Sequence, residues 1–255
     1  MAQIRIGCSG WHYTGWRGLF YPEKMPTKDF LAYYGQCFST TELNNPFYRL
    51  PKAQTAAAWR EGTPEGFLFA WKASRYLTHL KRLKDPEEPL SRMMGVAGHL
   101  KEKLGPILVQ LPPSMKVDRE RLARFLGALP KGQRFTLEFR HPSWYEAEVF
   151  DLLSDHDVAL CLSDHADAPA PWEVTASFVY VRGHGPGGRY YGHYSDETLK
   201  QWGDDVGRWR SGRRDVFVYF DNDQKTAAPK DARKLMDIVG GAALWTPDTL
   251  SQDPG

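Results

Sequence analysis

Short apolar runs alternate with segments of helical spacing along most of the chain. Eight of these runs, five to seven residues long, have the composition of buried strands and end at turn residues or polar groups. The predicted strands are Ile4–Cys8, Thr40–Asn44, Phe67–Lys72, Pro106–Leu111, Phe135–Arg140, Val158–Asp164, Phe178–Arg182 and Val216–Asn222.

Between the runs, apolar residues recur every three to four positions, as they do on one face of a helix. The stretch from Leu90 to Leu104 stops at Gly105, and the stretch from Leu199 to Trp209 follows Ser195, a candidate N-cap. Pro229 is expected to open the last helix. Repeated alternation of strands and helices predicts parallel strands joined by helical crossovers.

Eight strand-helix units are the count of a (β/α)8 TIM barrel, a fold of about 250 residues. We therefore predict an α/β protein with one TIM-barrel domain over residues 1–255 and a core over about residues 4–240. A doubly wound sheet is the alternative, but no GxGxxG motif follows the first predicted strand. No linker or change of composition in mid-chain indicates a second domain.

Every predicted strand ends in polar residues, and the carboxyl ends of barrel strands are where barrel enzymes keep their chemistry. In the second and fifth strands, the two-residue period directs Glu42, Asn44, Glu138 and Arg140 into the barrel mouth. Charges buried there must pair, because an isolated buried charge costs several kcal/mol. The mouth is then either a structural ion-pair network or, as we favour, a charged cleft that binds and transforms a polar ligand.

These strand ends supply the candidate site residues. Glu42 or Glu138 would act as general acid or base. Lys72, Arg140 and Arg182 would hold an anionic group, and Asp164 and Asn222 would orient the substrate. The predicted catalytic residues are Glu42, Lys72, Glu138, Arg140 and Asp164, and the predicted substrate-binding residues are Trp11, Tyr13, Asn44, Tyr48, Gln110, His141, Arg182, His184 and Asn222.

Aromatic residues concentrate in the segments that follow the strands. The chain has 9 Trp, 12 Tyr and 13 Phe, and Trp11, Tyr13 and Tyr48 lie directly after the first two strands. Rings above a charged mouth suit a ligand with a flat face, such as a sugar ring or a nucleobase. The alternative is that the rings cover the barrel and fasten the loops to it.

The charge balance argues against a protein held on nucleic acid by charge alone. Lys and Arg total 33 and Asp and Glu 31, so the formal net charge is +2. Contact with a polyanion would have to be local. The basic segments 75–84 and 208–214 keep one alternative open, a non-catalytic nucleic-acid-binding protein, although each segment is more typical of a solvated surface.

Other chemistry has weaker support. The glycine-rich segment 183–189 after the seventh strand could form a phosphate-binding nest. His184, Glu138 and Asp164 could converge on a divalent metal, but no HxH or HExxH motif is present, so we predict no metal and no cofactor. There is no GxSxG motif of a serine hydrolase.

The sequence indicates a cytoplasmic protein. Cys8, Cys37 and Cys161 are widely spaced and odd in number, as expected of thiols in a reducing compartment. No signal peptide pattern opens the chain, and no apolar run approaches the roughly 18 residues of a membrane span. The oligomeric state does not follow from the sequence.

Taken together, the strand-end blocks resemble the bacterial YecE-like family, also called domain of unknown function 72. The resemblance covers residues 4 to about 240 and is carried by the segments 6–22 (IGCSGWHYTGWRGLFYP), 41–51, 69–85, 105–114, 137–144 (LEFRHPSW), 159–165, 180–195 and 218–232. Asp221 and Asp231 depart from it, since the family more often has Asn at both positions.

The family resemblance implies a single TIM barrel and carries no reaction with it. The family's barrel is similar to those of sugar isomerases and apurinic endonucleases, a likeness of fold that suggests sugar phosphates or DNA as ligands. From the charged strand ends beneath aromatic loops, we expect an enzyme of the hydrolase or the isomerase and lyase type that acts on a polar or phosphate-bearing ligand, such as a sugar phosphate or a nucleotide.

Overall fold

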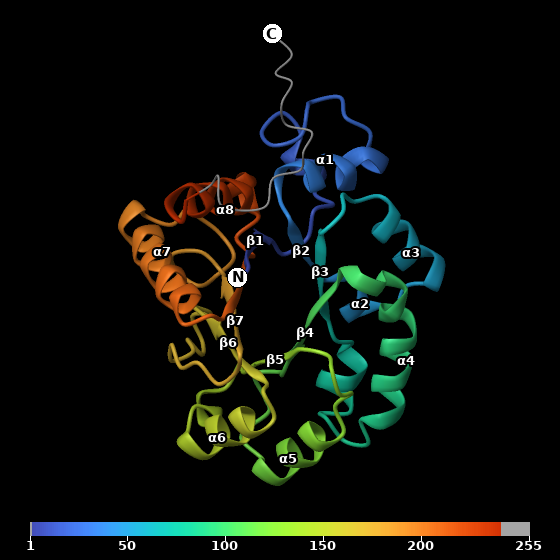
Figure 1. Cartoon of the computed structure of the whole chain (residues 1–255), viewed down its shortest axis with the longest axis vertical. Coiled ribbons are helices and arrows are strands. Elements are labelled where there is room, and N and C mark those ends of the chain that lie inside the picture. Colours follow the sequence, from blue (N-terminus) through green and yellow to red (C-terminus); the bar gives the residue numbers. More distant parts are fainter. Residues whose placement is uncertain (1, 241–255) are drawn as a thin grey trace.

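Eight parallel strands close into a barrel in the order of the sequence, with the helices outside the ring (Figure 1). The computed structural model describes residues 2–240. It confirms the (β/α)8 class and excludes the doubly wound sheet, since β8 pairs with β1 over five residue pairs. The strands are β1 (Ile4–Cys8), β2 (Thr40–Leu43), β3 (Leu68–Lys72), β4 (Leu104–Gln110), β5 (Phe135–Glu138), β6 (Ala159–Ser163), β7 (Phe178–Gly183) and β8 (Asp215–Phe220).

All eight predicted strands are present, and most boundaries shift by one or two residues. β5 ends at Glu138 and β8 at Phe220, before the predicted ends at Arg140 and Asn222. Arg140 and Asn222 leave the hydrogen-bonded ladder because they already belong to the loops over the mouth. The prediction of one domain over residues 1–255 concerns in part residues 1 and 241–255, which lie outside the described residues.

The helical layer matches the predicted spacing with two corrections. The segment Leu90–Leu104 is not one helix, because it breaks at Lys101 (φ 50°, ψ −125°) and then enters β4. Pro229 is the third residue of the last helix and does not open it. The α-helices are α1 (Phe30–Cys37), α2 (Asn45–Tyr48), α3 (Ala53–Glu61), α4 (Glu87–Ala97), α5 (Arg119–Gly127), α6 (Ala147–Asp155), α7 (Asp196–Ser211) and α8 (Ala227–Ile238).

Residues 164–177, which connect β6 to β7, contain no helix, so the sixth unit lacks the predicted crossover helix. Trp172 from this segment lies against α7 instead, with its ring stacked on Trp209 at 5.6 Å between centroids and tilted against Trp202 at 5.7 Å. Aromatic packing here takes the place of a helical crossover. Within residues 2–240, no helix has both the length and the apolar character that a membrane span needs.

The outward and inward faces of the strands contribute to two separate apolar clusters. Outward residues such as Phe69, Val109 and Leu137 join the large core under the helices. Inward residues form a second apolar cluster inside the barrel, made of Ala70, Leu108, Ala159, Cys161, Phe178, Tyr180, Phe217 and Tyr219. The barrel is therefore filled with apolar side chains, and polar groups lie above this cluster where the strands end.

Gly7 on β1 marks a close approach of two strands. A Cβ atom at this position would lie 2.1 Å from the carbonyl oxygen of Thr40 on β2. We expect Gly7→Ala to lower the free energy of unfolding by about 1–3 kcal/mol, because two backbone segments must move apart. Urea unfolding of this variant and of Gly15→Ala, which meets no atom within 4 Å, tests the prediction. Equal stability of both variants would contradict it.

Candidate active site

The carboxyl ends of the eight strands bring a layer of polar side chains together inside the barrel. Every strand supplies at least one inward residue at or just beyond its end: Ser9, Glu42, Lys72, Gln110, Glu138, Ser163, Arg182 and Asp221. This layer lies directly above the inner apolar cluster, because Tyr180 and Arg182 on β7, and Tyr219 and Asp221 on β8, are two residues apart.

Arg182 lies at the centre of the layer and is fully buried. Its Nε and Nη2 donate to both carboxylate oxygens of Glu42, at 3.1 and 2.8 Å, and its Nη1 donates to Glu138 Oε2 at 2.9 Å. Nη2 also donates to Asp221 Oδ2 at 2.8 Å and to Ser9 Oγ at 3.1 Å. The guanidinium thus joins strands β2, β5, β7 and β8 across the barrel.

Both glutamates are fully buried and saturated with donors. Glu42 accepts from Arg182, from the Tyr180 hydroxyl at 2.6 Å and from the Ser9 hydroxyl. Burial acts to raise the pKa of Glu42, but Arg182, Lys72 and the two hydroxyls outweigh it, so this pKa lies below its usual range. The predicted pairing of the interior charges is confirmed for these groups.

Glu138 accepts from Arg140 at 2.5 Å, from Gln110 Nε2 at 3.1 Å and from Ser163 Oγ at 3.3 Å, besides its bond from Arg182. Burial opposes ionisation, yet Arg140 and Arg182 hold the pKa of Glu138 well below its usual range. A carboxyl that stays ionised does not fit the role of general acid, so for Glu42 and Glu138 only the role of general base stays a prediction.

Lys72 differs from the other charges of the mouth. Within residues 2–240, its Nζ has no carboxylate within 4 Å and no hydrogen bond, and it lies 4.8 Å from the centre of the Phe47 ring. Burial and the nearby Arg182 lower the pKa of Lys72 to about 8, although Glu42 and Glu138 act in the opposite direction. The ammonium group is therefore available to a ligand.

Arg140 and His184 form the adjoining part of the mouth. Nη2 of Arg140 donates to His184 Nε2 at 3.1 Å, and Nη1 contacts the Tyr190 hydroxyl at 3.0 Å. Arg182 Nη1 also donates to His184 Nε2 at 3.1 Å, so the opposite ring nitrogen carries the proton and faces Asp164 Oδ1 at 3.2 Å. The buried Nε of Arg140 has no partner among the described residues.

Asp164 fixes the loop after β7. Its carboxylate accepts from the His184 backbone N–H at 2.7 Å and from the Tyr194 hydroxyl, which itself accepts from the Gly185 N–H at 2.7 Å. The Gly188 N–H bonds to the Gly185 carbonyl at 2.7 Å. These three N–H groups are used within the protein and are not free to bind a phosphate in the nest that the sequence suggested.

The glycines of this loop allow close packing. Gly185 has φ +92°, and a Cβ there would lie 2.3 Å from the Tyr191 carbonyl oxygen. Gly188 has φ +63°, and its Cβ would lie 2.4 Å from the Asp164 carbonyl oxygen. Backbone crowding and positive φ therefore explain why glycine occupies positions 185 and 188, and no bound anion is needed to account for them.

His184, Glu138 and Asp164 do converge, but cations of the protein occupy the space between them. His184 Nε2 lies 3.7 Å from Glu138 Oε1, and the guanidinium groups of Arg140 and Arg182 both point at that nitrogen. Within residues 2–240, no three or more His, Cys, Asp or Glu side chains are grouped as metal ligands. This donor set suits guanidinium groups and does not suit a metal ion.

At the end of β8 the residue that faces the mouth is Asp221, and not Asn222 as predicted. Asp221 reaches Arg182, whereas Asn222 is fully buried and donates to Asp231 Oδ2 and to the Gly192 carbonyl, both at 2.7 Å. Asn222 thus ties α8 to the loop after β7 and does not face the mouth. On β6, Ser163 is likewise the inward residue. The alternation used for β2 and β5 would have found Asp221 and Ser163.

The remaining predicted binding residues fall into two groups. Asn44 and Tyr13 belong to the mouth: both bond to Ser9, and the buried Asn44 Oδ1 has no partner among the described residues. Trp11 packs edge-on against Trp59 of α3 at 5.8 Å and thus fastens the first loop to the helical layer. His141 caps a short 3-10 helix by accepting from the Ser143 N–H at 3.1 Å.

The family model described as "Protein of unknown function DUF72" matches residues 5–253. This chain belongs to the DUF72 family. The match covers the barrel and all of the strand-end residues described above, which confirms the family expected from the sequence.

Relatives of this DUF72 protein include bacterial proteins. It is 26% identical over 273 residues to the UPF0759 protein YunF of Bacillus subtilis, an alignment that covers 92% of this chain and 94% of YunF. It is 27% identical over 143 residues to the UPF0759 protein YecE of Escherichia coli K12, covering 56% of this chain and 50% of YecE. A crystal structure of a DUF72 family protein from Thermotoga maritima, 28% identical, superposes with a TM-score of 0.83 over 93% of this chain and 99% of that one.

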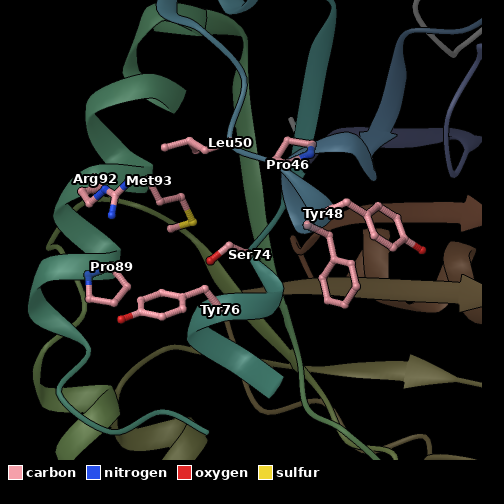
Figure 2. A pocket seen from close by; sticks show the side chains of 9 residues that line it. Pro46, Tyr48, Leu50, Ser74, Tyr76, Pro89, Arg92 and Met93 are labelled. Carbon is pink, nitrogen blue, oxygen red and sulfur yellow. The ribbon is translucent and has the colours of Figure 1, made fainter. Parts of the chain in front are cut away.

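A pocket of about 230 Å³ opens beside the DUF72 mouth, where β2 and β3 end (Figure 2). Figure 2 shows side chains of α4 facing those of the segments that follow β2 and β3. Phe47, which contacts Lys72, lines it together with Pro46, Tyr48, Leu50, Ser74, Tyr76, Pro89, Arg92 and Met93. Tyr48, a predicted binding residue, therefore belongs to this pocket, with 78% of its surface exposed.

The two basic segments lie at opposite ends of the barrel. Segment 75–84 follows the carboxyl end of β3, whereas segment 208–214 immediately precedes the amino end of β8. Because all eight strands are parallel, the two segments cannot form one continuous surface for a duplex. Nucleic-acid binding by either segment alone stays a prediction.

Proposed function

We propose that this DUF72 protein is a cytoplasmic enzyme that binds a small polar ligand at the carboxyl end of its barrel. The ligand carries an anionic group, as a sugar phosphate or a nucleotide does, and Lys72 is the main cation that contacts it. The observation that carries the proposal is the position of Lys72: an inward strand-end lysine without an ion pair within residues 2–240.

Contrast with the neighbouring cations supports this role. Arg182 donates to three carboxylates and has no capacity left for a ligand. Arg140 is held by Glu138, His184 and Tyr190. An anionic ligand would give Lys72 the counter-ion that the protein does not provide, and the gain is large where water is partly excluded.

The charge distribution around the mouth supports an anionic ligand on the β3 side. Burial lowers the pKa of His79 to about 4, and the cations of Lys72, Arg75, Arg140 and Arg82 add to this effect. These groups create a positive potential where segment 75–84 follows β3. That segment would then attract the anionic end of the ligand, while its apolar part contacts Phe47.

Enzymatic function and a cytoplasmic location are proposed on separate grounds. A TIM barrel with charged strand ends is the arrangement that barrel enzymes use, and a lysine whose pKa is lowered to about 8 is suited to proton transfer near neutral pH. The cysteines Cys8, Cys37 and Cys161 are all free thiols, as expected in a reducing compartment.

Titration calorimetry with ribose 5-phosphate, adenosine monophosphate and inorganic phosphate tests the proposal. We expect at least one of these probes to bind, and Lys72→Met to weaken that binding by about 10–100-fold, the worth of one charge-assisted hydrogen bond. The variant should remain folded, because it removes a partly buried charge that lacks an ion pair within residues 2–240.

Lys116→Met is the matched control, since Lys116 is exposed on the loop after β4. It should bind the probes as the wild type does. If no probe binds, or if Lys72→Met binds as tightly as the wild type, the proposal is wrong.

A further inference from the structure

We propose that Lys72 is a nucleophile that forms an imine with the carbonyl carbon of a small aldehyde or ketone substrate. This inference rests on the proposed function and names its substrate class: a phosphorylated or carboxylated compound that also carries a carbonyl group. It assigns to Lys72 a covalent step in addition to the binding of an anion.

The first support is that the amine is not used by the fold. The buried Lys103 shows what a structural lysine looks like here: its Nζ donates to the Arg60 carbonyl at 2.7 Å, to the Thr63 carbonyl at 2.7 Å and to the Thr63 hydroxyl at 3.2 Å. Lys72 makes no such bond within residues 2–240. Its nitrogen can therefore approach a substrate atom without breaking a hydrogen bond or an ion pair.

The second support is that the surroundings favour the neutral amine, which is the nucleophilic form. Burial, followed by the charge of Arg182, lowers the pKa of Lys72 to about 8, against the opposing effect of Glu42, Glu138 and Asp221. At pH 7.5, about a quarter of the Lys72 side chains would then be neutral, against about 0.1% for a lysine with the ordinary value of 10.4.

The third support is the space and chemistry beside the amine. Phe47, whose ring centre lies 4.8 Å from Lys72 Nζ, also lines the neighbouring pocket of about 230 Å³ together with Ser74, Tyr76 and Met93. This volume suits a compound of a few carbon atoms. The cations of Arg75 and Arg82 lie near His79 on the same side of the mouth and would hold its phosphate or carboxylate.

The proposed step is balanced. The nitrogen lone pair of Lys72 attacks the carbonyl carbon, and the electron pair of the C=O double bond moves to the oxygen, which takes up a proton. The resulting carbinolamine loses this oxygen as water while the nitrogen loses its remaining proton, which leaves the imine. Addition of water reverses the step and restores the amine and the carbonyl compound.

Borohydride trapping on the full-length protein tests the inference. Dihydroxyacetone phosphate, pyruvate and ribose 5-phosphate are the probes, each incubated at pH 7.5 with and without sodium borohydride, which delivers hydride to an imine and fixes it as a secondary amine. Peptide mapping by mass spectrometry then locates the added mass. We expect at least one probe to give a borohydride-dependent adduct on Lys72, at least tenfold above its level on any exposed lysine.

Two variants sharpen the result. Lys72→Arg keeps the charge and lacks the nucleophilic amine, so it should give no adduct in the barrel, whereas Lys116→Arg should give the wild-type adduct. Mapping in the wild-type protein locates the adduct even if Lys72→Arg folds poorly. An adduct level on Lys72 no higher than on exposed lysines, or no adduct with any probe, would overturn the inference.

The trapping result is separable from the binding result. If a probe binds in calorimetry and Lys72→Met weakens it, yet no adduct forms on Lys72, the imine is wrong and the proposed anion site stands. If no probe binds at all, the proposed function and the imine fail together.

Discussion

Replacing Arg182 with methionine should lower the free energy of unfolding by about 3–5 kcal/mol, the usual cost of removing one member of a buried ion-pair network. Arg182 is fully buried and donates to Glu42, Glu138 and Asp221. Without the guanidinium, two fully buried carboxylates each lose a charged partner and cannot reach water. Equilibrium unfolding in urea at pH 7 measures the effect.

Two further variants test whether the loss of stability comes from the buried network and not from the removal of a charge in general. Arg124→Met removes a pair whose arginine is 69% exposed, and it should change the unfolding free energy by less than about 1 kcal/mol. Arg182→Met combined with Glu42→Gln should recover part of the loss, because one orphaned charge is removed. A single Arg182→Met variant as stable as Arg124→Met would show that water reaches the carboxylates.

Acid should act on the same network through Glu138. The folded state holds the pKa of this carboxyl well below its ordinary value of 4.5, because Arg140 and Arg182 overcome the effect of burial. Below pH 4.5 the unfolded chain therefore binds a proton that the folded chain does not. The stabilisation by Glu138 is complete above pH 4.5 and is lost as the pH falls toward the folded-state pKa.

Glu138→Gln isolates this contribution. The variant should be less stable than the wild type at pH 7, because Arg140 and Arg182 lose a counter-charge. The gap should narrow below pH 4.5 by up to about 1.4 kcal/mol per pH unit, the value for one proton. Urea unfolding from pH 7 to pH 3 gives the gap, with the exposed Glu102→Gln as a control that should follow the wild type. A gap independent of pH would show that folding does not lower the pKa of Glu138.

The barrel could be predicted from the sequence because its signals are local. Apolar runs bounded by turn residues locate all eight strands, and a two-residue period within one strand places Glu42 and Glu138 inside. The same period, continued from Tyr219 and Cys161, indicates Asp221 and Ser163 as inward residues. These two could therefore have been found from the sequence with the rule already in use.

Other parts of the site depend on contacts that are distant in the sequence. Arg182 and Glu42 are 140 positions apart, so which strand-end charge would lack a partner was not visible in the sequence. Asn222 turns away from the mouth because Asp231 of α8 accepts its amide, and Trp11 leaves the mouth because Trp59 of α3 offers it a packing surface. The orientation of a loop side chain depends on such distant partners, and no periodic pattern in the sequence predicts it.

The central guanidinium also limits how the molecule can respond to a ligand. Arg182 bonds to residues of β2, β5 and the end of β8 from its own place on β7, and these bonds restrict changes in the diameter of the barrel opening. Adaptation to a bound molecule would then fall to the connecting segments, above all residues 184–194, which are held at their two ends by hydrogen bonds from the His184 and Tyr194 backbone N–H groups to the carboxylates of Asp164 and Asp231. The ends of the strands would then form the rigid part of the site, and the loops would determine selectivity between ligands of similar size.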